Sequence, residues 1–294
     1  MKIYWNKTAY EILSKIQQKI KSGQIKSWFF LLSWPANVGK KSAILNLINS
    51  LWVLPQDLMV IEDPGKVDWN LYQIKVDIPE KERILKINDK EFLNVWARQI
   101  IDFLSTTSFW NYKIVVIENI ERMNISAANA LLKNLEEPGE NKFIFATCSN
   151  QSKILPTILS RAFIINFYPV SFNEFVQFLK DNLISIPEIK QKILYAVSAG
   201  RIWLAKKLLE NNDDLLDLIE EFIQLDQQGK EIYSKFSLIK DLIQQQKIYS
   251  FLDWLAFYYS YSGDFDKVNK LVDIKQKTFS NVNIENLMFW FLLD

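Results

Sequence analysis

Five short apolar runs in the first 170 residues constrain the fold of this chain more than any other feature. Each holds four or five residues, many of them β-branched or aromatic, and is too short and too continuously apolar for an amphipathic helix. Segments with helical spacing separate them. The runs are Trp28–Leu32, Leu58–Ile61, Lys113–Ile117, Phe143–Thr147 and Phe163–Phe167, and the helical segments are Lys41–Leu51, Glu91–Leu104 and Ala127–Leu135. This alternation predicts an α/β domain with a mostly parallel sheet over residues 1–170.

The pattern changes after Pro169, where the strand signals stop. The spacing Ser-x-x-Glu, in which a hydroxyl and a carboxylate bind the free amides at a helix start, occurs at Ser171–Glu174 and at Ser185–Glu188. We therefore expect a small helical domain over residues 171–213. Residues 214–294 hold 8 Lys and no Arg against 13 acidic residues, and this shift of charge predicts a third, all-helical domain.

Large aromatic side chains crowd one segment of that third domain, Phe251–Phe265. Two interpretations stay open. The rings either fill the core of a thick helix bundle or form a surface for a partner, since interfaces are enriched in exposed aromatic residues. The rings within the segment are Trp254, Phe257, Tyr258, Tyr259 and Tyr261.

The composition of the 294 residues narrows the possible chemistry. There is no histidine and a single cysteine, Cys148, which excludes an internal disulfide, a Cys/His zinc cluster and any imidazole base. The formal net charge of +1 gives no overall attraction to nucleic acid or to an anionic membrane. No signal peptide is visible, and no run approaches the roughly 20 apolar residues of a membrane span, so we expect a cytoplasmic protein.

A Gly-Lys pair follows the first predicted strand, as in loops that bind nucleotide phosphates through backbone amides and a lysine. Trp34 stands where the first glycine of such a loop belongs, and Lys41 stands where a hydroxyl would bind magnesium. So short a motif also arises by coincidence. The candidate residues of this degenerate loop are Asn37, Val38, Gly39, Lys40, Lys41 and Ser42.

Glu118 and Asn119 follow the predicted strand Lys113–Ile117, at the place where an ATPase of this type holds two acidic residues. Glu118 could bind a metal ion, but Asn119 cannot accept a proton, and the chain offers no obvious substitute base. The plainer interpretation is that the pair ends a buried strand. For hydrolysis by the chain's own site we favour that interpretation, and we expect no dedicated metal site.

Three motifs in the middle of the chain follow one another at a characteristic spacing: Asn124–Pro138, Thr147–Asn150 and Leu155–Arg161. The spacing of apolar residues in the first motif predicts only an amphipathic helix, which ends at Pro138 and Gly139. Together the motifs resemble the AAA+ clamp-loader family of bacterial DNA polymerase III, and within it the delta-prime subunits. The resemblance covers about residues 1–210, and it implies an AAA+ P-loop core, a helical lid and an all-α collar-like domain.

The resemblance also implies partners and a site. Members of the family form a hetero-pentameric ring of gamma/tau and delta-type subunits that loads a sliding clamp on primed DNA, with ATP at the subunit junctions. Ser160 and Arg161 match the motif whose arginine enters the neighbour's ATP site, where such a finger raises the rate by about three to five powers of ten. Alternatively, Arg161 only complements the dipole of a short helix that starts at Pro156.

Two departures from the family bear on hydrolysis and on zinc. Residues 43–112 hold neither cysteine nor histidine, so the zinc module of many relatives is absent. Gly200 begins the segment where hydrolysing relatives place a Gly-x-x-Arg sensor, but Trp203 occupies the place of that arginine. We therefore expect no zinc, no required cofactor and at most weak ATP binding.

The sequence thus favours a non-hydrolysing clamp-loader subunit, not an enzyme by itself, that supplies Arg161 to a neighbour. One alternative is an ATP-hydrolysing motor subunit like gamma/tau, with an atypical site that includes Lys40, Ser42 and Glu118. Another is an AAA+-like interaction module outside replication.

Overall fold

The computed structural model describes residues 6–63, 66–67, 70–78, 84–87, 90–93, 96–210, 215–227, 232–245, 247–278 and 283–293. The chain divides into two compact units, residues 1–168 and 169–294. The first boundary lies two residues before the predicted one. The helices on both sides of residue 214 belong to the same unit, so the predicted division into 171–213 and 214–294 stays a prediction.

The first unit is built on a five-stranded parallel sheet in the order β2-β7-β8-β1-β9. All five strands lie where the apolar runs predicted them. The inner strands β1, β7 and β8 cross the buried core, whereas the edge strand β9 is exposed except at Ile165. The strands are β1 (Ser27–Ser33), β2 (Leu58–Ile61), β7 (Lys113–Ile117), β8 (Lys142–Cys148) and β9 (Phe163–Asn166). The predicted α/β fold class is therefore confirmed.

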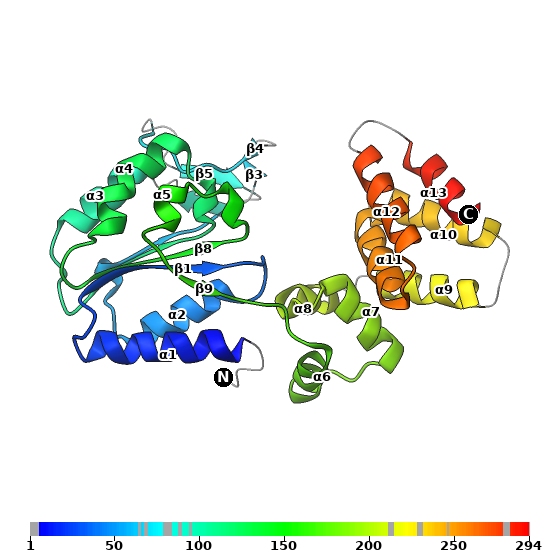
Figure 1. The fold of residues 1–294 in the computed structure, drawn as a ribbon, viewed down its shortest axis with the longest axis horizontal. Helices are drawn as coiled ribbons and strands as arrows, with labels where there is room; N and C mark the ends of the chain where they lie inside the picture. The colour runs from blue at the N-terminus through cyan, green and yellow to red at the C-terminus, as the bar shows by residue number, and fades with distance from the viewer. Residues whose placement is uncertain are drawn as a thin grey trace. The chain divides into compact units, whose positions relative to one another are not determined.

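Helices cover both faces of this sheet (Figure 1). One apolar cluster joins the sheet to α1 (Lys7–Lys21) and α2 (Lys40–Ser50), and a second joins it to α3 (Ala97–Ser105), α4 (Ile125–Glu136) and α5 (Pro156–Leu159). The helix α1 was not predicted, although Ala9, Leu13, Ile16 and Ile20 recur at helical spacing and are buried.

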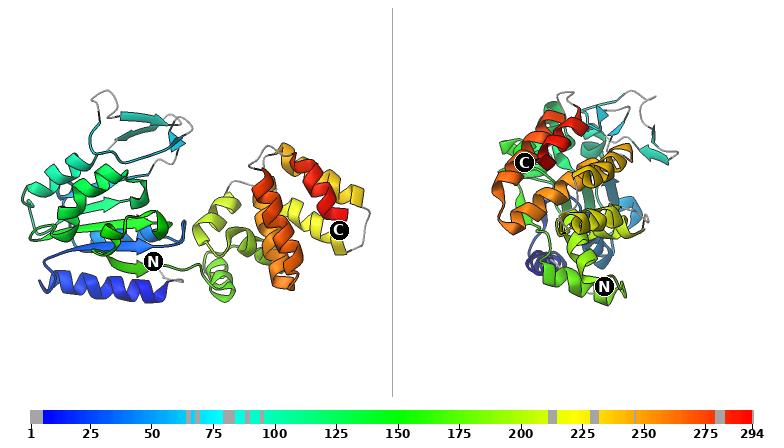
Figure 2. Two further views of the ribbon diagram at one scale, coloured as in Figure 1. Left: turned by 45° about the horizontal axis from the view of Figure 1, so that its top comes forward. Right: turned by 90° about the vertical axis from the view of Figure 1, so that its right-hand side faces the viewer.

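Two small antiparallel hairpins lie outside the central sheet (Figure 2). They pair β3 (Lys66–Val67) with β4 (Asn70–Leu71), and β5 (Ile84–Ile87) with β6 (Lys90–Leu93). The second hairpin corrects the predicted helix Glu91–Leu104, which begins only at Ala97. Residues 90–93 pair with a neighbouring strand instead, so tertiary hydrogen bonds override the helical spacing there.

The described elements of the second unit are all helices. Ser171 caps α6 and exchanges hydrogen bonds with Glu174, which confirms the first predicted capping box. The second, at Ser185, is wrong: α7 starts at Glu188 with Pro187 at its N-cap and no side-chain cap, which leaves Ser185 outside the first turn. The helices are α6 (Phe172–Asp181), α7 (Glu188–Ser198), α8 (Ile202–Glu210), α9 (Leu215–Gln227), α10 (Ile232–Gln244), α11 (Ile248–Ser262), α12 (Phe265–Thr278) and α13 (Ile284–Leu293).

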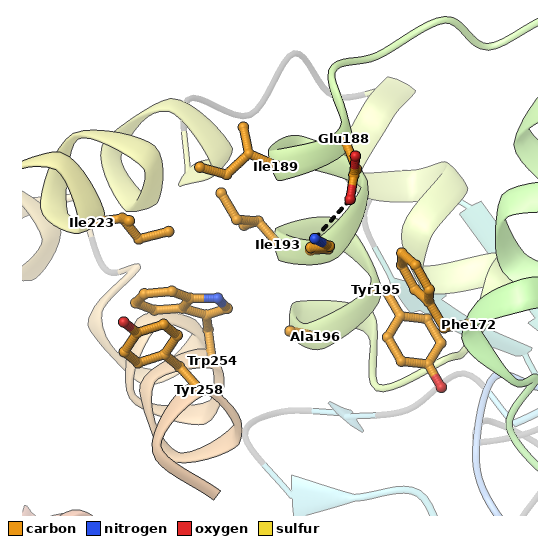
Figure 3. Close-up of a pocket in the computed structure, with 10 residues that line it drawn as sticks. Phe172, Glu188, Ile189, Ile193, Tyr195, Ala196, Ile223, Trp254 and Tyr258 are labelled. Carbon is orange, nitrogen blue, oxygen red and sulfur yellow. Dashed lines mark ion pairs between the residues drawn. The ribbon is translucent and has the colours of Figure 1, made fainter. Parts of the chain in front are cut away.

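The aromatic segment forms α11 and contributes to the core of this unit. Phe251, Trp254 and Tyr259 are buried, and Trp254 packs against Phe222 of α9. This burial favours the core interpretation for these rings, whereas the side chains of Phe257 and Tyr261 lie outside the described residues. Trp254 and Tyr258 also line an apolar pocket of about 660 Å³ (Figure 3). On α7, Glu188 and Lys192 belong to the same lining and form an ion pair at 2.7 Å.

No helix in the described part of the chain is long and apolar enough to cross a membrane.

Candidate functional site

The loop that connects β1 to α2 follows the carboxyl end of β1, an inner strand between β8 and β9. Its backbone turns sharply, with φ of +37° at Trp34, +61° at Asn37 and +87° at Gly39, which is the N-cap residue of α2. The indole of Trp34 is 52% exposed, so it does not fill the core. Among the other predicted loop residues, Asn37 and Ser42 are exposed and Val38 is buried.

Lys40 lies at the first position of α2 and is almost completely buried, with 6% of its surface exposed. Its ammonium group donates a hydrogen bond to the backbone oxygen of Pro35, within the same loop. Burial lowers the pKa of Lys40 to about 8, although attraction to Cys148 and Glu121 partly opposes this shift. The lysine that would reach a bound phosphate is therefore engaged by its own loop.

Lys41 joins the loop to two acidic residues at the ends of neighbouring strands. Its Nζ lies 2.6 Å from Oε1 of Glu62, which follows β2, and 2.5 Å from Oε1 of Glu118, which follows β7. Burial would lower the pKa of Lys41, but its hydrogen bonds and its attraction to Glu118 and Glu62 outweigh that effect and raise it. The ammonium group stays charged at neutral pH, and a charge of this sign repels a divalent cation.

Asn119 belongs to a network that fixes the chain after β7. Its backbone amide donates to Oγ1 of Thr147 at 3.0 Å, and its side-chain amide donates to Oδ2 of Asp63 at 2.7 Å. Nε of Arg122 donates to the same carboxylate oxygen at 3.1 Å. With φ of +48°, Asn119 also turns the backbone into the segment that precedes α4. This geometry supports the plainer interpretation, in which Asn119 ends a buried strand.

Arg161 lies just after the short helix α5, and its side chain is 28% exposed. Its Nε and Nη2 donate to Oε2 of Glu136 at 3.1 and 3.0 Å, and its Nη1 donates to the backbone oxygen of Thr157 at 2.8 Å. The Ser160 hydroxyl donates to the same Thr157 oxygen at 3.1 Å. The guanidinium is thus fixed at the surface of its own chain.

The structure brings the predicted loop and the predicted strand end together through Lys41 and Glu118. Within the described residues, no hydrogen bond or ion pair links Arg161 to that cluster. Sequence reasoning missed Glu62 and Glu136. Glu62 could have been found, because it directly follows the predicted strand Leu58–Ile61 and the ends of parallel strands meet at one edge. Glu136 gave no such signal, because it lies in a helix far along the chain from Arg161.

The helical unit holds the segment expected to carry a sensor arginine. Gly200 precedes α8 with φ of +67°, and a Cβ there would lie 2.7 Å from the backbone oxygen of Val170. Trp203, at the position of the missing arginine, is 54% exposed, and Nζ of Lys207 lies 5.6 Å from the centre of a ring of its indole. Arg201 donates from Nε to the backbone oxygen of Ser198 at 2.8 Å, so it does not replace that arginine as a free cation.

A protein-family model described as "DNA polymerase III, delta subunit" matches residues 8–171, more than half of the chain. The chain belongs to this family. The match covers the parallel sheet, the loop and Arg161, and it confirms the expected relation to bacterial clamp-loader subunits.

Curated relatives carry the names of several such subunits. The gamma subunit of DNA polymerase III from Buchnera aphidicola (subspecies Baizongia pistaciae) is 26% identical over 60% of this chain and 44% of its own length. The delta-prime subunit of Pseudomonas aeruginosa is 42% identical over 22% of this chain and 20% of its own length. Human replication factor C subunit 5 is 24% identical over 80% of this chain and 64% of its own length. The chain thus spans less than two thirds of each of these relatives.

Solved structures support the fold. A DNA polymerase III gamma-subunit-related protein from Thermotoga maritima superimposes with a TM-score of 0.55 over 96% of this chain and 97% of that one, at 18% identity. A mutant of RuvB from the same organism gives a TM-score of 0.50 over 73% of this chain and 64% of that one, at 14% identity. At such identities the likeness bears on the fold alone.

Proposed function

We propose that this chain is a clamp-loader subunit that does not hydrolyse ATP at its own loop and that lends Arg161 to the ATP site of a neighbouring subunit. The observation that carries the first half is the position of Lys41 between Glu62 and Glu118. Magnesium is held by carboxylate and hydroxyl oxygens, and here a lysine ammonium already neutralises the carboxylates. These residues do not fit a magnesium ion, and Lys40 bonded to Pro35 is not free for phosphate.

In this proposal the chain's own loop also lacks a general base for hydrolysis. Asn119 has no basic group, and its side-chain amide donates to Asp63. It therefore fixes the backbone after β7 and does not activate a water molecule. In this proposal the chain contributes to the ring through surface contacts with its neighbours, and not through ATP hydrolysis of its own.

Arg161 supports the second half, because its side chain is partly exposed and the residue lies just after the short helix α5. An arginine offered across a subunit interface stabilises the charge that spreads over a transferring phosphoryl group. We infer that the chain assembles with gamma/tau- and delta-type subunits, and that the assembled ring acts on a sliding clamp at primed DNA. The names of the relatives and the family match support this assembly.

The test is Arg161→Ala in the full chain, assembled with the other clamp-loader subunits. We expect the rate of clamp-stimulated ATP hydrolysis by the ring to fall, because the ATP site that receives this arginine loses its contribution. Size-exclusion chromatography should show that the ring still assembles. Arg98→Ala is the matched control, because Arg98 is an exposed arginine that pairs with Asp77 in the same unit. An unchanged rate in the Arg161 variant would remove the assignment.

A second candidate function is an ATP-hydrolysing motor subunit, and the sequence likeness to a gamma subunit favours it. In that case Glu118 would have to release Lys41 and bind the metal ion. Steady-state ATP turnover by the purified chain separates the two candidates. Turnover that Glu118→Gln abolishes would replace the first proposal, and absence of turnover would leave it standing.

A further inference from the structure

The contacts of Arg161 divide its guanidinium into an engaged part and a free part. A guanidinium carries five N–H donors, one on Nε and two on each terminal nitrogen. The three hydrogen bonds to Glu136 and Thr157 use the donor of Nε and one donor of each terminal nitrogen. One N–H on Nη1 and one on Nη2 are therefore left for another acceptor.

Two donors on the terminal nitrogens form the fork that binds two oxygens of a phosphate group. Glu136 binds the Nε–Nη2 edge of the guanidinium, so the remaining N–H groups of the terminal nitrogens can engage phosphate oxygens without loss of this ion pair. Glu136 is the last residue of α4, whereas Thr157 belongs to α5, so two helices fix the plane of the group. A long arginine side chain otherwise loses rotamer entropy when it binds, and an existing ion pair reduces that loss.

We propose that Glu136 is a positioning residue that holds the Arg161 guanidinium ready for a phosphoryl group of the neighbouring subunit. This inference rests on the function proposed above. Glu136 touches neither the nucleotide nor the reacting atoms; it acts through Arg161 alone. The carboxylate of Glu136 is 59% exposed, so solvent screens its attraction, and the effect on the rate is modest.

The first test is Glu136→Ala in the full chain within the assembled ring. We expect kcat for clamp-stimulated ATP hydrolysis at the dependent site to fall about three- to fivefold, as expected for one exposed ion pair, with KM for ATP unchanged. Glu136→Gln keeps an acceptor without the charge, so its rate should lie between those of the wild type and Glu136→Ala. Glu137→Ala is the matched control, because Glu137 is the adjacent, exposed carboxylate and forms no bond with Arg161.

A double variant separates positioning from a general loss of structure. In the Arg161→Ala background, Glu136→Ala should cause no further loss of rate, because its effect acts through the arginine. If Glu136→Ala lowered the rate equally in the wild-type and Arg161→Ala backgrounds, the inference would be overturned. A Glu136→Ala rate equal to or above that of the wild type would also overturn it. If Arg161→Ala itself has no effect, the proposed function fails first.

A second measurement needs no ring. The Nε–H signals of arginines can be observed in a ¹H–¹⁵N spectrum of the chain alone, and the sequence holds only Arg83, Arg98, Arg122, Arg161 and Arg201. We expect the Arg161 Nε–H to exchange slowly with water in the wild type and in Glu137→Ala, and rapidly in Glu136→Ala. Equal exchange in the two variants would contradict the positioning role even if the ring proved to depend on Arg161.

Discussion

Replacing Lys40 by methionine is expected to stabilise the folded chain at neutral pH. Lys40 is buried at the start of α2, and its one described hydrogen bond goes to the Pro35 backbone oxygen. Methionine has a similar length and no charge, so it keeps the packing and removes the cost of burying an ammonium group. The hydrogen bond to Pro35 offsets only part of that cost.

The magnitude follows from the pKa of Lys40, which burial lowers from 10.5 to about 8. A shift of this size corresponds to about 3 kcal/mol at a pH below 8, where both folded and unfolded chains hold the proton. Losing the bond to Pro35 removes about 1 kcal/mol, so we expect Lys40→Met to raise the free energy of unfolding by about 2 kcal/mol at pH 7.

The pH dependence gives the sharper test. Between pH 8 and 10.5 the unfolded chain keeps a proton on Lys40 that the folded chain has released, so wild-type stability rises with pH relative to the variant. Urea unfolding at pH 7 and pH 9.5, followed by tryptophan fluorescence, should therefore show the variant's advantage shrinking by about 2 kcal/mol. Lys153→Met, at an exposed position, serves as the control. A variant that is less stable at pH 7, or an advantage independent of pH, would refute the reasoning.

Two further predictions concern Lys41 and Gly200. Lys41→Thr leaves Glu62 and Glu118 without their shared cation, so it should lower the melting temperature in EDTA, and millimolar Mg²⁺ should raise the melting temperature of the variant but not of the wild type. No response of the variant to Mg²⁺ would argue against Lys41 as the group that replaces the metal ion. Gly200→Ala should lower the free energy of unfolding by about 2 to 4 kcal/mol, because its Cβ would lie 2.7 Å from the Val170 oxygen in a left-handed backbone. Gly263→Ala, with φ of +81° and open space around it, should lose only about 1 kcal/mol, and urea unfolding that found equal losses would contradict the steric reasoning.

The central sheet could be predicted because its strands are apolar on both faces. Leu58–Ile61 and Lys113–Ile117 coincide with β2 and β7 to the residue, since both runs end where the chain leaves the buried layer. The errors occur where a distant partner decides the conformation. Residues 90–93 form a strand because residues 84–87 lie beside them, and no periodicity within the segment itself reports that neighbour.

The candidate site was predicted only in part, for the same reason. The residue types at Lys40, Lys41 and Glu118 indicated an altered phosphate loop, but the sequence did not show that Lys41 bridges Glu62 and Glu118. The ion pair of Arg161 with Glu136 depends on how α5 packs against α4. Such contacts arise from the register of whole helices and strands, which a motif of six or seven residues does not contain.

The ammonium group of Lys41 is tethered to the backbone, and this has a consequence for the cell. A diffusible cation occupies its ligands only in proportion to its free concentration, but a covalently attached one is present in every folded copy. The charge balance at the tips of β2 and β7 then stays constant when magnesium levels fall or energy supply fluctuates. The positions of Glu62 and Glu118 are then set by folding alone and not by the supply of a metal ion.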